Sequence, residues 1–349
     1  MKKLAIALVA LLVMAVVALL VLPSFWDWNG EKGRLAALVK QHTGRGLEIA
    51  GDVSLRLLPT PAFSAEQVTL ANLEGGSEPV MARLEELRIS IALLPLLRGE
   101  VLVESVTLVR PDILLEVLED GRANWVLADA PPADAASPVT PSDSGSSAAT
   151  QPIRIDSFLI EGGRVRYRDA RSGAAETLEG LNAELAAGSL VGPFAATGTA
   201  VYRGVPLAFD MNLGRLVDDG ATATSLSLEL PRAAASASFV GAVSRHQDLQ
   251  TLRGRLQAEG GDLAQVLAAL SLQGASPGGG LLARSFALSA ELSASETEAK
   301  AESLEITFGP LSLDGRVTAD LSGAPAFTAS LAASTVDLDA LLGPEEQAA

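Results

Sequence analysis

Short segments in which apolar and polar residues alternate follow one another along most of this chain. Val53, Leu55 and Leu57 are separated by polar residues, and Leu87, Ile89 and Ile91 repeat the pattern. Further segments of this kind are centred near Val106, Leu228, Leu256, Leu288, Ile306 and Leu313. A period of two is typical of strands with one buried and one solvated face, which belong to antiparallel sheets. The sequence therefore predicts a mainly β protein.

Few helices are available to cover so much apolar sheet surface. One short helix is expected after Asn29, which can cap it, with Leu35, Leu38 and Val39 on one face and Gly44 at its end. Two arrangements remain open. Two sheets can pack on each other as a sandwich, which periodicity alone favours, or one elongated, curved antiparallel sheet can keep an apolar trough.

The chain begins with two lysines and an apolar run from Leu4 to Leu22, long enough for a helix to cross a bilayer. We expect residues 1–28 to form an inner-membrane anchor with the lysines in the cytoplasm. The anchor residues that we single out are Leu4, Leu11, Val16, Leu22, Trp26 and Trp28. The alternative is a cleaved signal peptide, but no small-x-small site separates Leu22 from bulky Phe25 and Trp26.

Composition limits the classes of function. The net charge is −16, which argues against binding to nucleic acid or to acidic lipid head groups. Aromatic residues make up 4% of the chain and aliphatic residues abound, so the apolar surface suits hydrocarbon better than sugars or bases. The chain has no cysteine and two histidines, His42 and His246, both expected at the surface. We expect no catalytic, metal or cofactor site.

A segment poor in large apolar residues divides the β-rich part. Residues 129–151 consist mainly of Ala, Pro, Ser, Thr and Asp, and we expect them to form a disordered linker. Residues 29–128 would then be a first β domain with its short helix. Residues 152–343 would be a second β-rich region, and 344–349 an acidic tail.

Weak internal repeats cross this linker. The apolar positions of residues 101–115 recur in residues 153–167 at a constant offset of 52, with bends expected near Pro111 and Gly163. Gly192-Pro193-Phe194, followed by Gly198, is echoed by Gly309-Pro310-Leu311, followed by Gly315. Asp262 and Asp337 each precede a short run typical of an aspartate-capped helix. Repeats of this kind indicate a sheet extended by repetition.

Residues 29–125 contain several short motifs in a fixed order. They are Thr43-Gly44-Arg45; Gly51-Asp52-Val53-Ser54-Leu55-Arg56-Leu57-Leu58-Pro59-Thr60-Pro61; Leu70-Ala71-Asn72; Leu93-Leu94-Pro95-Leu96-Leu97-Arg98-Gly99; and Gly121-Arg122-Ala123-Asn124-Trp125. In this order, the motifs resemble the N-terminal region of the AsmA family of bacterial inner-membrane proteins. From the residues alone, we interpret Asn124 as a turn amide and Trp125 as a packed indole.

The resemblance implies an inner-membrane anchor, a periplasmic body of repeating β-groove type and a role in outer-membrane biogenesis. The expected ligands are phospholipid acyl chains, and the expected partners include an outer-membrane assembly or lipid-handling protein. Together with the alternation of apolar and polar residues, the resemblance implies an apolar trough. The residues expected to line it are Val53, Leu55, Leu57, Leu87, Ile89 and Ile91. The alternative is a structural or regulatory factor that affects outer-membrane protein assembly, or protein targeting to the membrane, through contacts with other proteins on sheet edges.

Overall fold

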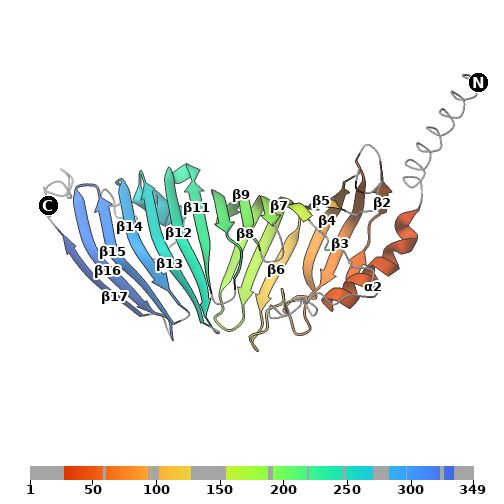
Figure 1. Ribbon diagram of the computed structural model, residues 1–349, viewed down its shortest axis with the longest axis horizontal. Coiled ribbons are helices and arrows are strands. Elements are labelled where there is room, and N and C mark those ends of the chain that lie inside the picture. Colours follow the sequence, from red (N-terminus) through yellow and green to blue (C-terminus); the bar gives the residue numbers. More distant parts are fainter. Residues whose placement is uncertain are drawn as a thin grey trace, which may run out of the picture. The chain divides into compact units, whose positions relative to one another are not determined.

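The computed structural model describes residues 27–57, 60–92, 95, 102–126, 155–187, 192–217, 220–246, 249–269, 283–295, 297–322 and 326–333. It divides into two compact units, Met1–Thr177 and Leu178–Ala349, here called unit 1 and unit 2. In both, most of the described residues lie in strands (Figure 1), which confirms the mainly β prediction. The expected anchor, apart from Asp27 and Trp28, lies outside the described residues. Among those residues, no helix is long and apolar enough to span a bilayer.

The short helix predicted after Asn29 is present. A 3-10 turn, η2 (Trp28–Glu31), leads into α2 (Lys32–Thr43), which ends at Gly44 in the left-handed conformation, with φ of 69°. The predicted cap was wrong, because the Asp27 side chain accepts the Asn29 N–H at 3.0 Å. The Asn29 side chain instead accepts the Val53 N–H at 3.1 Å and so ties η2 to the sheet.

Seven strands form the sheet of unit 1. They are β1 (Leu47–Ile49), β2 (Val53–Arg56), β3 (Ala62–Ala71), β4 (Val80–Ile91), β5 (Val103–Val109), β6 (Asp112–Val117) and β7 (Ile155–Asp169). The pairs from β1 to β6 are antiparallel, with β1 and β2 both on β3 and with β5 and β6 both on β4. β7, however, runs parallel to β5 and β6, so the purely antiparallel sheet predicted from the sequence was wrong here.

The offset of 52 in the sequence repeat is the register of this parallel pairing. Val106 lies opposite Phe158, and Ile113 lies opposite Val165. The first copy breaks into β5 and β6 at Arg110, whose φ is 44°, whereas β7 continues through Gly162, whose φ is 63°. The two copies therefore lie side by side in one sheet, which confirms extension by repetition.

Helix α2 covers part of the sheet. Val53, Ala65 and Val68 are buried in a cluster that also contains Leu35 of α2 and Trp28 of η2. The sequence offered few helices to cover the sheet, and the short predicted helix covers it at this point. α2 is short, but its Leu35 side is enough to close over the β1–β3 end of the sheet.

Ten strands follow one another in the second half of the chain. They are β8 (Ala175–Ala187), β9 (Phe194–Tyr202), β10 (Val205–Leu213), β11 (Ala221–Leu230), β12 (Ala235–His246), β13 (Leu249–Gly260), β14 (Phe286–Ala294), β15 (Glu298–Phe308), β16 (Leu311–Asp320) and β17 (Ala326–Ala333). From β8 onward, each strand pairs antiparallel with the next. The described part of unit 2 contains no second sheet packed on this one, so the sandwich is not formed there.

Two small elements interrupt this meander. The 3-10 turn η3 (Pro231–Ala233) joins β11 to β12, and α4 (Leu263–Ala269) lies between β13 and β14. The predicted aspartate cap is confirmed, since the Asp262 carboxylate accepts the Gln265 N–H at 3.0 Å. Val266 of α4 packs on Ala235 and Phe286 at one end of the strands. The second predicted aspartate cap, at Asp337, lies outside the described residues.

The chain position that divides the two units differs from the domain boundary expected from the sequence. The expected linker, 129–151, and the acidic tail, 344–349, lie outside the described residues. β7 follows this linker in the chain but pairs with β5 and β6, and so belongs to unit 1. The division falls after Thr177 because the repeat across the linker joins its two flanks into one sheet.

All five glycines within β9–β16 lie on one face of the unit 2 sheet. They are Gly198, Gly241, Gly254, Gly260 and Gly315. A Cβ atom on Gly254 would lie 2.4 Å from the Val240 carbonyl oxygen, so only glycine allows the two strands to approach this closely. The ring of Phe239 covers both Gly241 and Gly254, its Cζ atom lying 2.7 Å from either Cβ position.

Candidate functional site

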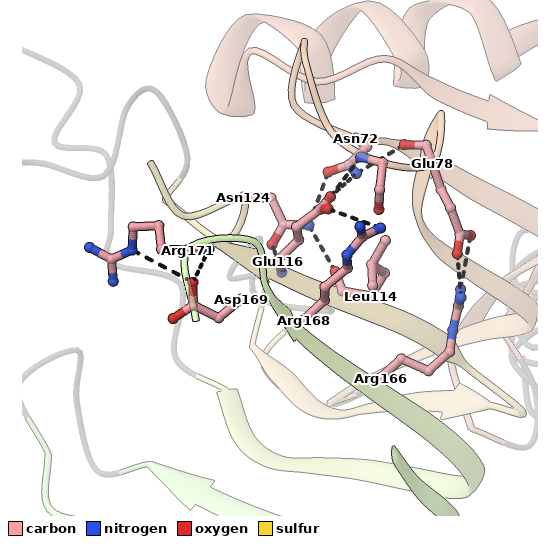
Figure 2. A network of polar contacts seen from close by, with 10 residues as sticks. Asn72, Glu78, Leu114, Glu116, Asn124, Arg166, Arg168, Asp169 and Arg171 are labelled. Atoms are coloured by element: carbon pink, nitrogen blue, oxygen red, sulfur yellow. Dashed lines mark hydrogen bonds and ion pairs between the residues drawn. The ribbon is translucent and has the colours of Figure 1, made fainter. Parts of the chain in front are cut away.

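A dense polar cluster lies in unit 1 and brings together three of the family-like motifs (Figure 2). The Asn124 side chain is fully buried in the turn after β6. Its oxygen accepts the Glu116 N–H at 2.9 Å, and its nitrogen donates to the Asn72 side chain at 2.9 Å and to the Leu114 carbonyl at 2.8 Å. Arg45, 6% exposed, donates to the Asn124 carbonyl at 3.0 Å.

Glu116 is the charged centre of this cluster and is only 2% exposed. Its carboxylate accepts the Ser77 N–H at 2.9 Å and the Asn72 side-chain nitrogen at 3.3 Å, with Arg168 4.0 Å away. Burial acts to raise the pKa of Glu116, but hydrogen bonds from Ser77 and Asn72 and the charge of Arg168 hold it below its ordinary value. The cluster joins β3, β6, β7 and the α2–β1 connection, and we interpret it as structural.

This cluster makes unit 1 sensitive to acid. A carboxylate with a lowered pKa stabilises the fold above its ordinary value of 4.5 and loses that contribution as pH falls through the lower native value. We expect the unfolding free energy of unit 1 to fall at acid pH, and Glu116→Gln to reduce this dependence. All three tryptophans lie in residues 1–177, so denaturation followed by their fluorescence measures unit 1. Glu104→Gln, exposed on β5, is the control; an unchanged pH dependence in Glu116→Gln would contradict the assignment.

The interpretation of Asn124 as a turn amide is confirmed, whereas Trp125 is less packed than predicted. The Trp125 ring lies 6.4 Å from Tyr167 and the residue is 42% exposed. His42 is exposed in the last turn of α2, as expected. In the described part of the chain, no three acidic, histidine or cysteine side chains gather as metal ligands would.

The predicted trough residues of unit 1 share one face but differ in burial. The strand register places Val53 in one row with Ala65 and Leu87, and Leu55 in the next with Phe63 and Ile89. Ile91 lies opposite Val103 on β5, and Leu57 lies one residue beyond β2. Val53, 4% exposed, and Leu87 belong to the cluster beneath α2. Leu55, Leu57, Ile89 and Ile91 are half-buried, and their lining role stays a prediction.

Unit 2 carries a more extensive apolar face. The central row crosses all ten strands without a polar side chain. It comprises Ala183, Gly198, Phe209, Leu228, Ala237, Ala258, Leu288, Ile306, Leu313 and Ala333. Strands lie about 4.8 Å apart, so this row is about 43 Å long. We call this side of the sheet the apolar face.

A second row on the apolar face also crosses the ten strands and has one threonine. It comprises Ala187, Phe194, Leu213, Thr224, Gly241, Gly254, Leu292, Ala301, Val317 and Ala329. Between them, Leu226, Phe239 and Leu256 continue the surface. Most of these side chains are half-buried, as expected when neighbours in a sheet shield one another but no second layer among the described residues covers them.

Beside these two rows, the charged side chains of the strands lie on the opposite face. The row one residue away from the central one comprises Glu184, Thr197, Asp210, Ser227, Ser238, Gln257, Ser289, Glu305, Asp314 and Ala332. Arg255 and Glu291 form an ion pair of 2.7 Å on this side. The sheet thus separates a solvated acidic face from a hydrocarbon-like one. It has no general acid, base or nucleophile on the apolar face rows.

The sequence predicted five of these ten strands, β11, β13, β14, β15 and β16, but did not assign their apolar residues to the site. The alternation at Leu226, Leu256, Leu288 and Ile306 was a usable signal. What was missing is the register, because only pairing shows that the apolar positions of ten strands fall into common rows.

Comparison with protein families finds a match to the model of the AsmA family over residues 1–215. Comparisons with curated proteins and with solved structures found no match. The matched residues include all of unit 1, with its buried Arg45–Asn72–Asn124 cluster, and the first strands of the apolar face. The chain therefore belongs to the AsmA family.

Proposed function

We propose that this protein is a non-enzymatic, membrane-anchored carrier of phospholipid acyl chains that acts in outer-membrane biogenesis. The observation that carries the proposal is the unbroken central row of the apolar face, which crosses ten strands of a single-layer sheet. A soluble protein rarely leaves so large an apolar surface without a ligand or partner. Membership of the AsmA family supports an outer-membrane or lipid-related role.

The expected mechanism is burial of hydrocarbon rather than chemistry. Each methylene removed from water contributes about 0.8 kcal/mol. Because Leu228, Leu288 and Leu313 recur along the central row and only apolar residues lie between them, the surface offers similar free energy at successive positions. A lipid chain could then move along the row without meeting a deep trap. The row of about 43 Å exceeds the depth of one bilayer leaflet, about 15 Å of hydrocarbon.

The proposed location follows from the first 28 residues. The run from Leu4 to Leu22 would hold the chain in the inner membrane, with the β-rich units in the periplasm. Lipid would enter from that membrane, and a gradient or a partner protein of the outer-membrane pathway would set the direction. Neither a cofactor nor a metal is needed for this role.

A photoreactive amino acid at Leu288 or Ser289 tests the proposal directly. These neighbours on β14 lie on opposite faces, Leu288 on the apolar face and Ser289 on the acidic one. After irradiation of the full-length protein in cells, we expect phospholipid adducts at position 288 and far fewer at 289. Mass spectrometry of the purified protein would identify them. Protein adducts without lipid at 288 would overturn the proposal and favour the assembly-factor alternative.

A further inference from the structure

The last described strand of unit 2 has unusual exposure. β17 hydrogen-bonds to β16 between Leu313 and Asp320, and the described residues place no strand on its other side. Every residue of β17 is exposed, whereas the strands before it have half-buried apolar residues. Phe327 is 73% exposed and Leu331 is 47% exposed. Both lie on the apolar face, opposite Ala319 and Gly315.

β17 also lacks the features that usually prevent edge strands from pairing. Its sequence, Ala326–Ala333, contains no charged residue, no proline and no glycine. Its pairing with β16 shows no bulge, unlike the pairing of β15 with β16. An open, regular and uncharged edge presents free N–H and C=O groups in the spacing that another strand needs.

We propose that β17 is a dimerisation edge, at which a second copy of this chain pairs antiparallel with it. A twofold axis perpendicular to the sheet relates two such strands and keeps equivalent faces on the same side. The apolar faces of the two copies would therefore continue into each other. The chain carries a net charge of −16, so an edge without charge is where two copies can approach with least repulsion.

The side chains of β17 are self-complementary in one register. With Ser330 on the axis, Phe327 lies opposite Ala333 of the second copy, and Leu331 lies opposite Ala329. Every large apolar side chain thus meets an alanine on the same face, and each such pair occurs twice. A second copy fits for this reason better than an unrelated strand, because one sequence supplies both the large side chains and the spaces for them.

Cysteine cross-linking tests the register. The chain contains no cysteine, so Ser330→Cys creates a single thiol that would face its copy across the axis. In the full-length protein in detergent, we expect mild oxidation to convert most of this variant to a disulfide-linked dimer. Thr307→Cys, exposed on the same face but two strands from the edge, is the matched control and should form little disulfide-linked dimer. Equal dimer yields from the two variants would overturn the proposal.

A second variant tests association without cross-linking. Ser330→Asp places two carboxylates opposite each other in the dimer. We therefore expect the mass measured by sedimentation to fall from that of a dimer to that of a monomer. Thr307→Asp, the control, should leave the mass unchanged. A monomeric parent protein, or a dimer unaffected by Ser330→Asp, would refute the dimerisation edge. So would a Ser330→Cys adduct to a different protein. The proposal does not depend on lipid carriage, which the Leu288 and Ser289 experiment tests separately.

Discussion

Replacing Asn124 by alanine should lower the unfolding free energy of unit 1 by about 3 kcal/mol or more. The substitution leaves the Glu116 N–H and the Leu114 carbonyl without their partners, and each unsatisfied buried group costs about 1–3 kcal/mol. Such a loss is a large part of the 5–15 kcal/mol typical of a domain. Denaturant unfolding followed by tryptophan fluorescence measures it.

Two further variants separate hydrogen bonding from packing. Asn124→Asp keeps the shape of the side chain but places an acceptor against the Asn72 oxygen and the Leu114 carbonyl, so we expect at least the same loss. Asn212→Ala, an exposed asparagine of β10, should have little effect. A change below about 0.5 kcal/mol in Asn124→Ala would mean that the cluster does not stabilise unit 1.

Replacing Leu228 by aspartate should reduce lipid binding by about a hundredfold. Leu228 lies in the middle of the central row, between Phe209 and Ala237. An aspartate in hydrocarbon costs about 3 kcal/mol, which corresponds to this factor. Lipid that co-purifies with the protein can be quantified by mass spectrometry. Ser227→Asp, one residue away on the acidic face, is the control and should retain lipid.

The same variant distinguishes an open surface from a packed core. Because Leu228 is half-buried and no second sheet among the described residues covers it, we expect Leu228→Asp to keep its far-UV circular dichroism and its thermal midpoint within a few degrees. Cooperative loss of structure would instead show that Leu228 lies in a closed core, as in a sandwich. Lipid carriage on the apolar face would then lack its physical basis.

Local patterns in the sequence predicted many elements of this fold. The alternation located strands such as β2, β4, β11 and β14, Gly44 marked the end of α2, and Asp262 marked the start of α4, whereas β8, β9, β10, β12 and β17 were not predicted. The offset of 52 even contained the register of β7, although repeats alone do not say whether two copies pair side by side. Choosing between a sandwich and a single layer was beyond such patterns, because both bury the same face of each strand.

The sites depended on contacts distant in sequence. Asn124 and Arg45 were recognisable within motifs, but Glu116 lies in an ordinary strand pattern. Only its hydrogen bonds from Ser77 and Asn72, which are distant in sequence, make it part of the cluster. Val53 was predicted to line a trough and instead lies beneath α2. Its periodicity is the same as that of Leu55, and only the position of the helix distinguishes the two.

The strictly sequential pairing of β8 to β17 makes unit 2 a one-dimensional array. Each strand depends on its chain neighbours, so contacts are local and folding can start at any hairpin and spread in both directions. Adding or removing one whole hairpin would preserve strand direction and the assignment of every side chain to its face. Length is therefore a property that such a sheet can change in steps of two strands, while a one-residue insertion inside a strand would turn its apolar side chains to the solvent.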